Sequence, residues 1–426
     1  MRILVCDDEE ARCNDIVSSI REGVDNAPER LVGQDLTDAL ESLRQGINGC
    51  IDDPENCKPF AKLPFDDADI VLLDNNLAHL ASTGARLTAE AIIGNIRAFS
   101  SAPYIISLNK NTDVDFDLRY LVGDYETRAD VALNTAHLAN PALWTGDQTA
   151  AKGGFLPWYW PRLEKAPTRR RKQIDFIREH LADSVLTTLG FDDDAIGFLS
   201  PHALGALSPR AESDGSQNEG LAPRDITFRD VFIARDRSLP VQSDRDALSQ
   251  AQEAGNKFID EIIARTVAAD IDFWFRQDVV GPQEPLVDVP HLLMRFPFLL
   301  GDRANDINAW NESTKADKPP YGLEQKLYDE HLAAAEYEHD VWVPTTCFWW
   351  PKLKSDEKLN EYFFRAKEGE WAEVVFCEDG SEFLERENAD NNSPVEFPAE
   401  FEGSWSRRYV SRIDGVQYAP LSRLAL

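Results

Sequence analysis

ADIVLLDNN, residues 68–76, is the stretch that decides the fold of the first third of the chain. The residues from Ile70 to Leu73 are apolar without alternation, a pattern typical of a strand buried on both faces of a parallel sheet. The run ends at Asp74, so a carboxyl group stands at the carboxyl end of the strand. In open parallel sheets ligands bind at that end. The stretch therefore predicts a central strand with a functional residue at its tip.

Further apolar runs on both sides of this stretch alternate with helical patterns, whereas residues 48–67 lack a period and indicate an inserted loop. The alternation predicts an α/β fold with a doubly wound, flavodoxin-like parallel sheet of five strands. The other expected strands are RILVC (2–6), Arg30–Gly33, APYIISL (102–108) and ADVALN (129–134). The expected helices are 11–24, TDALESLRQGI after a cap at 35–37, and 84–99.

The composition changes after residue 140, so residues 1–140 are predicted to form a domain of their own. All ten tryptophans follow that point, and residues 141–172, rich in Pro and aromatics, are interpreted as a connector. A mainly helical domain is expected over 173–305 and a mixed α+β segment over 306–426. Whether these two form one domain is left open. Helices are predicted at 173–190 and about 245–277, and strands at 342–350 and 372–385, with Asp379-Gly380 as a hairpin-turn signal.

The net charge of −31 restricts the partners of the chain. Acidic residues outnumber basic ones on both sides of residue 140, and such a surface repels phosphate backbones, which disfavours nucleic-acid binding. The basic stretch Arg169–Lys172 is interpreted as a solvated linker or a helix start. No apolar run reaches the ~20 residues that span a bilayer, and the first residues carry no basic signal segment. A cytoplasmic protein without membrane contact is expected.

The cysteines and histidines form no recognisable motif. The six cysteines lack CxxC spacing, so reduced thiols are expected, Cys50 and Cys57 included. His331 and His339 lie eight residues apart among glutamates, which leaves a metal site as an alternative to a solvated acidic helix. Three aromatic clusters are expected to pack in the core rather than line a pocket: 158–160, 273–275 and 348–350.

Polar side chains also follow the first and fourth strands. Asp7 and Asp8 come directly after RILVC, and Ser107 and Lys110 lie at the end of the fourth strand. Because neighbouring parallel strands end at one edge, these groups are expected to converge on Asp74. Crowded carboxylates repel each other unless a cation joins them, and Mg²⁺ prefers oxygen ligands. The pattern predicts a Mg²⁺ site in which Asp74 acts as a nucleophile, with a solvated acidic strand edge as the alternative.

Over residues 2–138 this pattern resembles the receiver domain of bacterial response regulators. The resemblance is carried by the acidic pair after the first strand, by Asp74 with the following DNNL and a helix begun by Gly84, and by the hydroxyl of Ser107. It implies that Asp74 is the phospho-acceptor and that Ser107 is the hydroxyl through which phosphorylation switches the domain.

The resemblance also implies a set of metal ligands. Asp8 and Asp74 would bind Mg²⁺ together with the backbone carbonyl of Asn76, and Asp7 would assist through a water molecule. Two features depart from the family: Asn134 stands where the family has a lysine, and no clear helix separates the fourth and fifth strands. Lys110 is the candidate to replace that lysine.

The function expected on this basis is two-component signalling. A partner sensor histidine kinase or phosphotransfer protein would phosphorylate Asp74, and the C-terminal region would act by binding another protein. Residues 141–426 carry no recognisable catalytic motif, so a receiver-regulated enzyme is left open rather than predicted. An atypical receiver that acts without phosphorylation stays open as well, whereas a transcription regulator is disfavoured by the acidity. A homodimer is also left open.

Overall fold

In the computed structural model of the chain, the five expected apolar runs form one sheet in the order β2-β1-β3-β4-β6. All four strand pairs in it are parallel. β1, β3 and β4 are buried along their whole length, as expected for strands covered on both faces. The predicted fold class is thereby confirmed for the N-terminal region. The strands are β1 Ile3–Asp7, β2 Glu29–Val32, β3 Ile70–Asp74, β4 Tyr104–Leu108 and β6 Val131–Leu133.

The structure describes most, but not all, of the chain. The described residues are 1–21, 23–53, 57–59, 62–74, 77, 89–108, 116–117, 129–133, 138–145, 163–207, 222–235, 257–339, 341–359, 374–378, 380–391, 409–411 and 416–417. Gly84, Asn76, Lys110, Asn134 and Asp379, which the sequence singles out, lie outside them.

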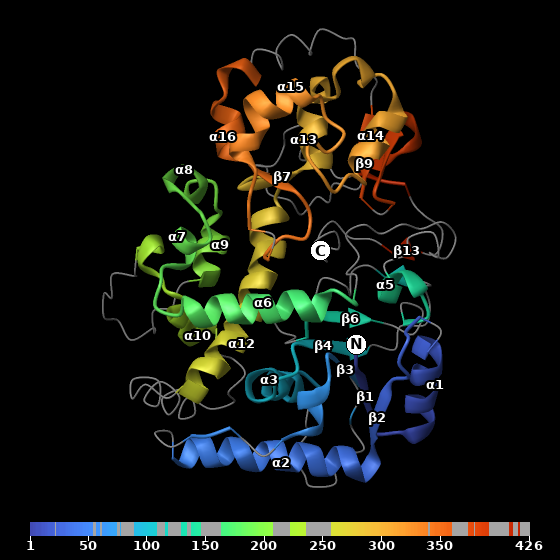
Figure 1. The fold of residues 1–426 in the computed structure, drawn as a ribbon, viewed down its shortest axis with the longest axis vertical. Coiled ribbons are helices and arrows are strands. Elements are labelled where there is room, and N and C mark those ends of the chain that lie inside the picture. Colours follow the sequence, from blue (N-terminus) through green and yellow to red (C-terminus); the bar gives the residue numbers. More distant parts are fainter. Residues whose placement is uncertain are drawn as a thin grey trace.

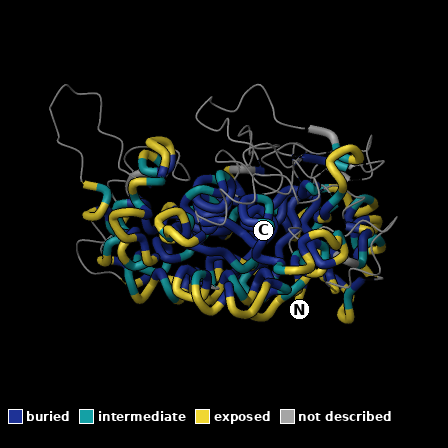
Figure 2. Tube along the Cα trace, turned by 90° about the horizontal axis from the view of Figure 1, so that it is seen from above, coloured by how far each residue is buried: buried dark blue, intermediate teal, exposed yellow. Residues whose placement is uncertain are grey.

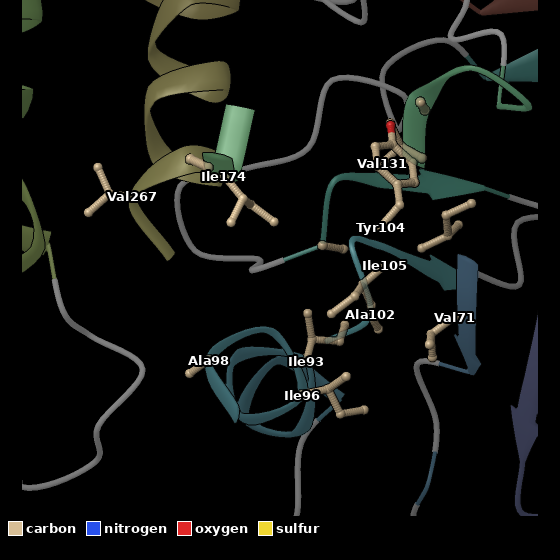
Figure 3. Packing of buried hydrophobic residues seen from close by; sticks show 14 of the residues in the cluster. Val71, Ile93, Ile96, Ala98, Ala102, Tyr104, Ile105, Val131, Ile174 and Val267 are labelled. Atoms are coloured by element: carbon tan, nitrogen blue, oxygen red, sulfur yellow. The ribbon is translucent and has the colours of Figure 1, made fainter. Parts of the chain in front are cut away.

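Helices cover the sheet (Figure 1). α1 packs against β1 and β2, while α3 packs against β3 and β4 and contacts α2. In Figure 3 the side chains of Ile93 and Ile96, on α3, lie close to Ile105 of β4. Burial of these apolar side chains stabilises the sheet by about 25 cal/mol for each Å² removed from water. The helices are α1 Glu10–Arg21, α2 Gly33–Asp52 and α3 Ala89–Phe99.

α2 differs from the expectation at both ends. It begins at Gly33, before the cap expected at 35–37, and Val32 in the capping position makes no side-chain hydrogen bond. It continues to Asp52, into the stretch expected to be a loop, because Ile47 and Cys50 extend its buried face. The loop prediction is therefore wrong for residues 48–52.

The cysteine prediction also needs a correction at this helix. Cys50 forms a disulfide with Cys57, and their Cα atoms lie 4.5 Å apart. Reduced thiols were expected throughout, but the chain beyond the end of α2 returns to Cys50, a proximity that a seven-residue spacing does not reveal. The other four cysteines are buried.

Two helices from beyond residue 140 pack close to the N-terminal sheet. α6 contacts β4, and α12 contacts both α3 and α6 (Figure 1). Ile174 of α6 and Val267 of α12 belong to the same buried cluster as the strands (Figure 3). The hydrophobic core is thus continuous across residue 140, and the division there stays a prediction from composition. The elements are α5 Pro141–Thr145, α6 Ala166–Glu179 and α12 Lys257–Trp274.

The helical region otherwise departs from the expected bounds. The helix expected at 173–190 begins at Ala166 and ends at Glu179, so the basic stretch 169–172 lies inside it. A helix start was one of the two interpretations of that stretch; Arg170, however, is buried rather than solvated. The remaining helices here are α7 Val185–Thr188, α8 Asp193–Ile196, a 3₁₀ turn Pro223–Asp225, α9 Pro201–Leu207, α10 Phe228–Arg235 and a π-helical turn Phe275–Val280.

Most of the described elements between residues 286 and 391 build the upper part of the molecule in Figure 1, around a second buried cluster. Its helices are α13 Val289–Arg295, α14 Ile307–Ser313, α15 Gln325–Leu327 and α16 Trp350–Ser355, with a π turn Tyr328–Leu332 and 3₁₀ turns Pro297–Arg303, Ala333–Ala335 and Arg386–Asn388. A further 3₁₀ turn, Pro64–Asp67, lies in the N-terminal region.

Short strands complete the C-terminal region. β9 and β10 pair antiparallel around the predicted turn, which confirms the hairpin, whereas the strand expected at 342–350 is limited to β8. β7 pairs with β8, and β5 pairs with β13. The strands are β5 Phe116–Asp117, β7 Leu286–Asp288, β8 Cys347–Trp349, β9 Val374–Cys377, β10 Glu382–Glu385, β11 Asp390–Asn391, β12 Tyr409–Val410 and β13 Val416–Gln417.

Most aromatic residues of the two clusters within the described residues are buried, and Figure 2 shows much buried chain in the middle of the molecule. Trp274 and Phe275 are fully buried, as is Phe348, so core packing is confirmed for these residues. The cluster at 158–160 lies outside the described residues. Among the helices that the structure describes, none is both long enough and apolar enough to cross a bilayer.

Candidate functional site

The sheet register brings the acidic residues of the first and third strands to the same level. β1 and β3 are neighbours, and Cys6 pairs with Leu73, so Asp7 and Asp74 both stand at the carboxyl edge. Both strands are apolar on both faces up to the aspartate, so a shift of one residue would bring a carboxyl group level with an apolar residue of the neighbouring strand. The convergence predicted from the strand ends is therefore present.

Three carboxylates meet at this edge. Asp7, Asp8 and Asp74 each offer an oxygen, and these oxygens lie within 4.8 Å of one another. Asp7 and Asp74 are buried, at 0% and 2% exposure, whereas Asp8 is half-buried. The group therefore reaches the protein surface on the side of Asp8. We call these three residues the acidic site.

Arg12 supplies a positive charge to the acidic site. Its Nη1 lies 2.5 Å from Asp74 Oδ2, its Nε lies 3.6 Å from Asp7 Oδ2, and its Nη2 lies 2.9 Å from Glu9 Oε2. The side chain comes from the first turn of α1, the helix that follows β1 directly. Sequence reasoning missed this residue. The available signal was an arginine four residues after Asp8, one helical turn beyond the strand end.

Burial and charge act against each other at Asp7. The pKa of Asp7 is raised to about 6, chiefly by burial and also by the nearby Asp74. The Glu9 backbone N–H donates to Asp7 Oδ1 at 2.8 Å and favours the ionised form, as does Arg12. Within the described residues Asp7 Oδ2 is buried and accepts no hydrogen bond. This oxygen fits a metal ligand, because an ion would satisfy it where no protein donor does.

Ser107 lies on the strand next to Asp74. It is buried, and its register partner is Leu73, while Asp74 pairs with Leu108. No hydrogen bond joins the Ser107 hydroxyl to the acidic site in the part of the chain that the structure describes. Asn76, Lys110 and Asn134 lie outside that part, so their predicted roles stay predictions.

The histidine alternative finds no geometric support among the described residues. His331 lies in a π-helical turn and its Nδ1 is 2.7 Å from Asp356 Oδ2, while the ring of His339 packs against Phe176 and Tyr337. The helix ends before His339, so the two rings do not share a helix face. Within the described chain, Asp7, Asp8 and Asp74 are the group suited to hold a metal ion.

A scan against protein-family models, a search of curated proteins and a search of solved structures each give no match to this chain. The geometry of the site is therefore the basis for its interpretation. Its donors are all carboxylate oxygens, which are the ligands that hard divalent cations such as Mg²⁺ prefer.

Proposed function

We propose that the acidic site is a phospho-acceptor site, in which Asp74 takes a phosphoryl group with the help of Mg²⁺. The observation that carries the proposal is the meeting of three carboxylates, one of them the buried Asp74, at the carboxyl edge of a five-stranded parallel sheet. A carboxylate in this position can act as a nucleophile toward phosphorus. The resemblance to receiver domains supports the same role.

The reaction transfers a phosphoryl group from a phosphorylated donor to the carboxylate of Asp74. An Asp74 oxygen attacks the phosphorus of the donor, the new O–P bond forms, and the bond from phosphorus to the donor breaks. The donor, an imidazole of a histidine kinase or phosphotransfer partner, leaves with the electron pair. Asp7, Asp8 and Asp74 would hold the ion, which neutralises charge that builds up on the phosphoryl oxygens.

The proposed output lies in the C-terminal region. α6 packs against β4 and α12 packs against α3, and their buried side chains belong to one hydrophobic core. A structural change at the sheet can therefore pass through packed side chains to residues beyond 140. In this scheme the phosphorylation state alters how the C-terminal region binds a protein partner. Coupling of this kind needs an element with two arrangements, and the end of β4 at Ser107 is the candidate.

Incubation with acetyl phosphate and Mg²⁺, followed by intact-mass measurement, tests the proposal. The wild-type protein should gain the mass of one phosphoryl group, and chelation of Mg²⁺ should prevent the gain. Asp74→Asn should gain nothing, whereas Asp15→Asn, which removes an exposed acid from α1, should behave as the wild type. An equal gain in Asp74→Asn would refute Asp74 as the acceptor.

A second candidate is an atypical receiver that works without phosphorylation. The contact of 2.5 Å between Arg12 and Asp74 favours it, because a guanidinium already balances the acceptor carboxylate. This candidate predicts that neither Mg²⁺ nor acetyl phosphate changes the mass or the melting temperature of the protein.

A further inference from the structure

The acidic site already contains a cation that belongs to the chain. Arg12 contacts Asp74 Oδ2 at 2.5 Å and faces Asp7 Oδ2 at 3.6 Å, the oxygen that accepts no hydrogen bond from the described residues. A Mg²⁺ ion bound by the same carboxylates needs oxygen distances of about 2.1 Å. The Arg12 guanidinium and the ion would then both lie next to one carboxylate oxygen, and they would repel each other strongly because the site is partly buried.

We propose that Arg12 is a built-in counter-ion that competes with the divalent cation, an inference that rests on the phospho-acceptor function proposed above. In the metal-free state the guanidinium joins Asp74 to Asp7 and reduces their repulsion. Metal binding requires Arg12 to leave Asp74.

Glu9 offers Arg12 a second position. Arg12 Nη2 lies 2.9 Å from Glu9 Oε2, and the Glu9 side chain is half-exposed while that of Asp74 is buried. Arg12 can therefore withdraw toward Glu9, outside the carboxylate group, without losing every ionic partner. From there its N–H donors remain close enough to the mouth of the site to meet the oxygens of an incoming phosphoryl group.

The Mg²⁺ affinity of the acidic site would then depend on how strongly Arg12 pairs with Asp74. Without Arg12 the three carboxylates should repel one another more strongly when no metal is bound. They should also bind a divalent cation more tightly. Stability without metal and metal affinity should therefore change in opposite directions, which a purely structural role of Arg12 would not produce.

Calorimetric titration of the full-length protein with Mg²⁺ tests the competition. Arg12→Gln should bind Mg²⁺ at least about tenfold more tightly than the wild type, a difference of about 1.4 kcal/mol. Arg12→Lys keeps the charge but cannot span two carboxylates, so its affinity should lie between the two. Arg21→Gln removes an exposed arginine from the same helix and should leave the affinity unchanged.

Thermal melting provides a second readout. In a chelator Arg12→Gln should melt below the wild type, and saturating Mg²⁺ should remove that deficit. Equal or weaker Mg²⁺ binding by a folded Arg12→Gln protein would overturn the competition, as would an equal gain in Arg21→Gln, which would assign the effect to long-range charge.

The outcomes also separate the two proposals. Absence of Mg²⁺ binding in every variant would overturn both. The expected order of affinities without any phosphoryl gain on Asp74 would retain the competition and reject the phospho-acceptor function.

Discussion

The strands of the N-terminal sheet begin at an amino edge and end at a carboxyl edge, and buried carboxylates at these two edges differ in their charged partners. At the amino edge, Asp130 precedes β6 and accepts hydrogen bonds of 2.6 Å from both Arg97 and Arg170, with a third from the Ile105 N–H at 2.7 Å. Arg170 also reaches Asp272 at 3.1 Å. The positive groups there match the acids, and all are buried. At the carboxyl edge, Arg12 contacts two of the three aspartates, Asp74 Oδ2 at 2.5 Å and Asp7 Oδ2 at 3.6 Å.

The pKa directions follow this difference. Burial alone would raise the pKa of Asp272, but Arg170 and Arg276 outweigh it and hold the pKa well below the ordinary range. At Asp7 burial prevails and the pKa rises to about 6. A buried carboxylate that is paired with arginines stabilises the fold. A buried carboxyl oxygen that accepts no hydrogen bond from the described residues, such as Asp7 Oδ2, is suited to bind a cation from solution.

The amino edge also joins the sheet to the rest of the chain. Asp130 directly precedes β6, Arg170 lies on α6 and Asp272 on α12. Arg170 Nη1 also donates to the Ala268 carbonyl at 2.7 Å. These contacts link residues that are distant in sequence, such as Arg170 and Asp272 on two separate helices. The network therefore fixes α6 and α12 against the sheet in addition to their apolar packing.

The largest expected effect is on stability at the amino edge. Arg170→Gln leaves two buried carboxylates without their shared partner and should reduce the free energy of unfolding by about 3–5 kcal/mol. Arg171→Gln is the matched control, because this adjacent arginine is half-exposed and pairs with Asp69 at the surface. Its cost should be about 1 kcal/mol or less. Urea denaturation of both variants measures the difference, and similar losses would contradict the assignment of a buried network.

The next effect is the gain in stability on Mg²⁺ binding, which should depend on the carboxyl edge and not on the amino edge. At a Mg²⁺ concentration of about 100 times the dissociation constant, the wild type should gain about 2.7 kcal/mol of stability. Asp74→Asn should lose that gain. Asp272→Asn should start from a lower stability and keep the gain, because Asp272 is remote from the acidic site. The urea denaturation midpoints of each variant with and without Mg²⁺ measure this gain. An undiminished gain in Asp74→Asn would show that the ion does not bind at the acidic site.

The smallest effect is on the pH dependence of stability. A carboxyl group with a lowered pKa in the folded state contributes stability that is present above its unfolded pKa of about 4 and is lost as the pH falls toward its folded pKa. The pKa of Asp272 is lowered, so the wild type should lose stability below about pH 4. Asp272→Asn, although less stable at neutral pH, should lose less over that interval. Denaturation at pH 7 and about pH 3 checks this, with Asp15→Asn as the control. Parallel pH profiles for wild type and Asp272→Asn would show that Asp272 titrates alike in both states.

Much of the N-terminal fold could be predicted because its signals are local. Continuous apolar runs such as 70–73 identify buried parallel strands, and each strand shows in its own residues where it ends. The meeting of Asp7 with Asp74 followed from two strand ends and the rule that parallel strands share an edge. Bounds were less accurate where packing decides them, as at the two ends of α2.

The residues that were missed are those whose partners lie far away in the chain. Arg170 stands in a run of basic residues that is typical of a solvated surface, and nothing near it in sequence indicates Asp130 or Asp272. Cys50 and Cys57 are close in sequence, but their pairing depends on how the chain turns back after α2. Long-range charge pairing and chain reversal leave no periodic signature.

The amino-acid sequence by itself determined the parallel sheet and the acidic strand ends, because hydrophobic periodicity and residue type act locally along the chain. Only the tertiary structure decided which positive charges accompany the buried acids: Arg12 at the carboxyl edge, and Arg97, Arg170 and Arg276 at the amino edge. The reason is that ionic contacts depend on distances across the folded molecule, and these distances exist only after the helices have packed on the sheet.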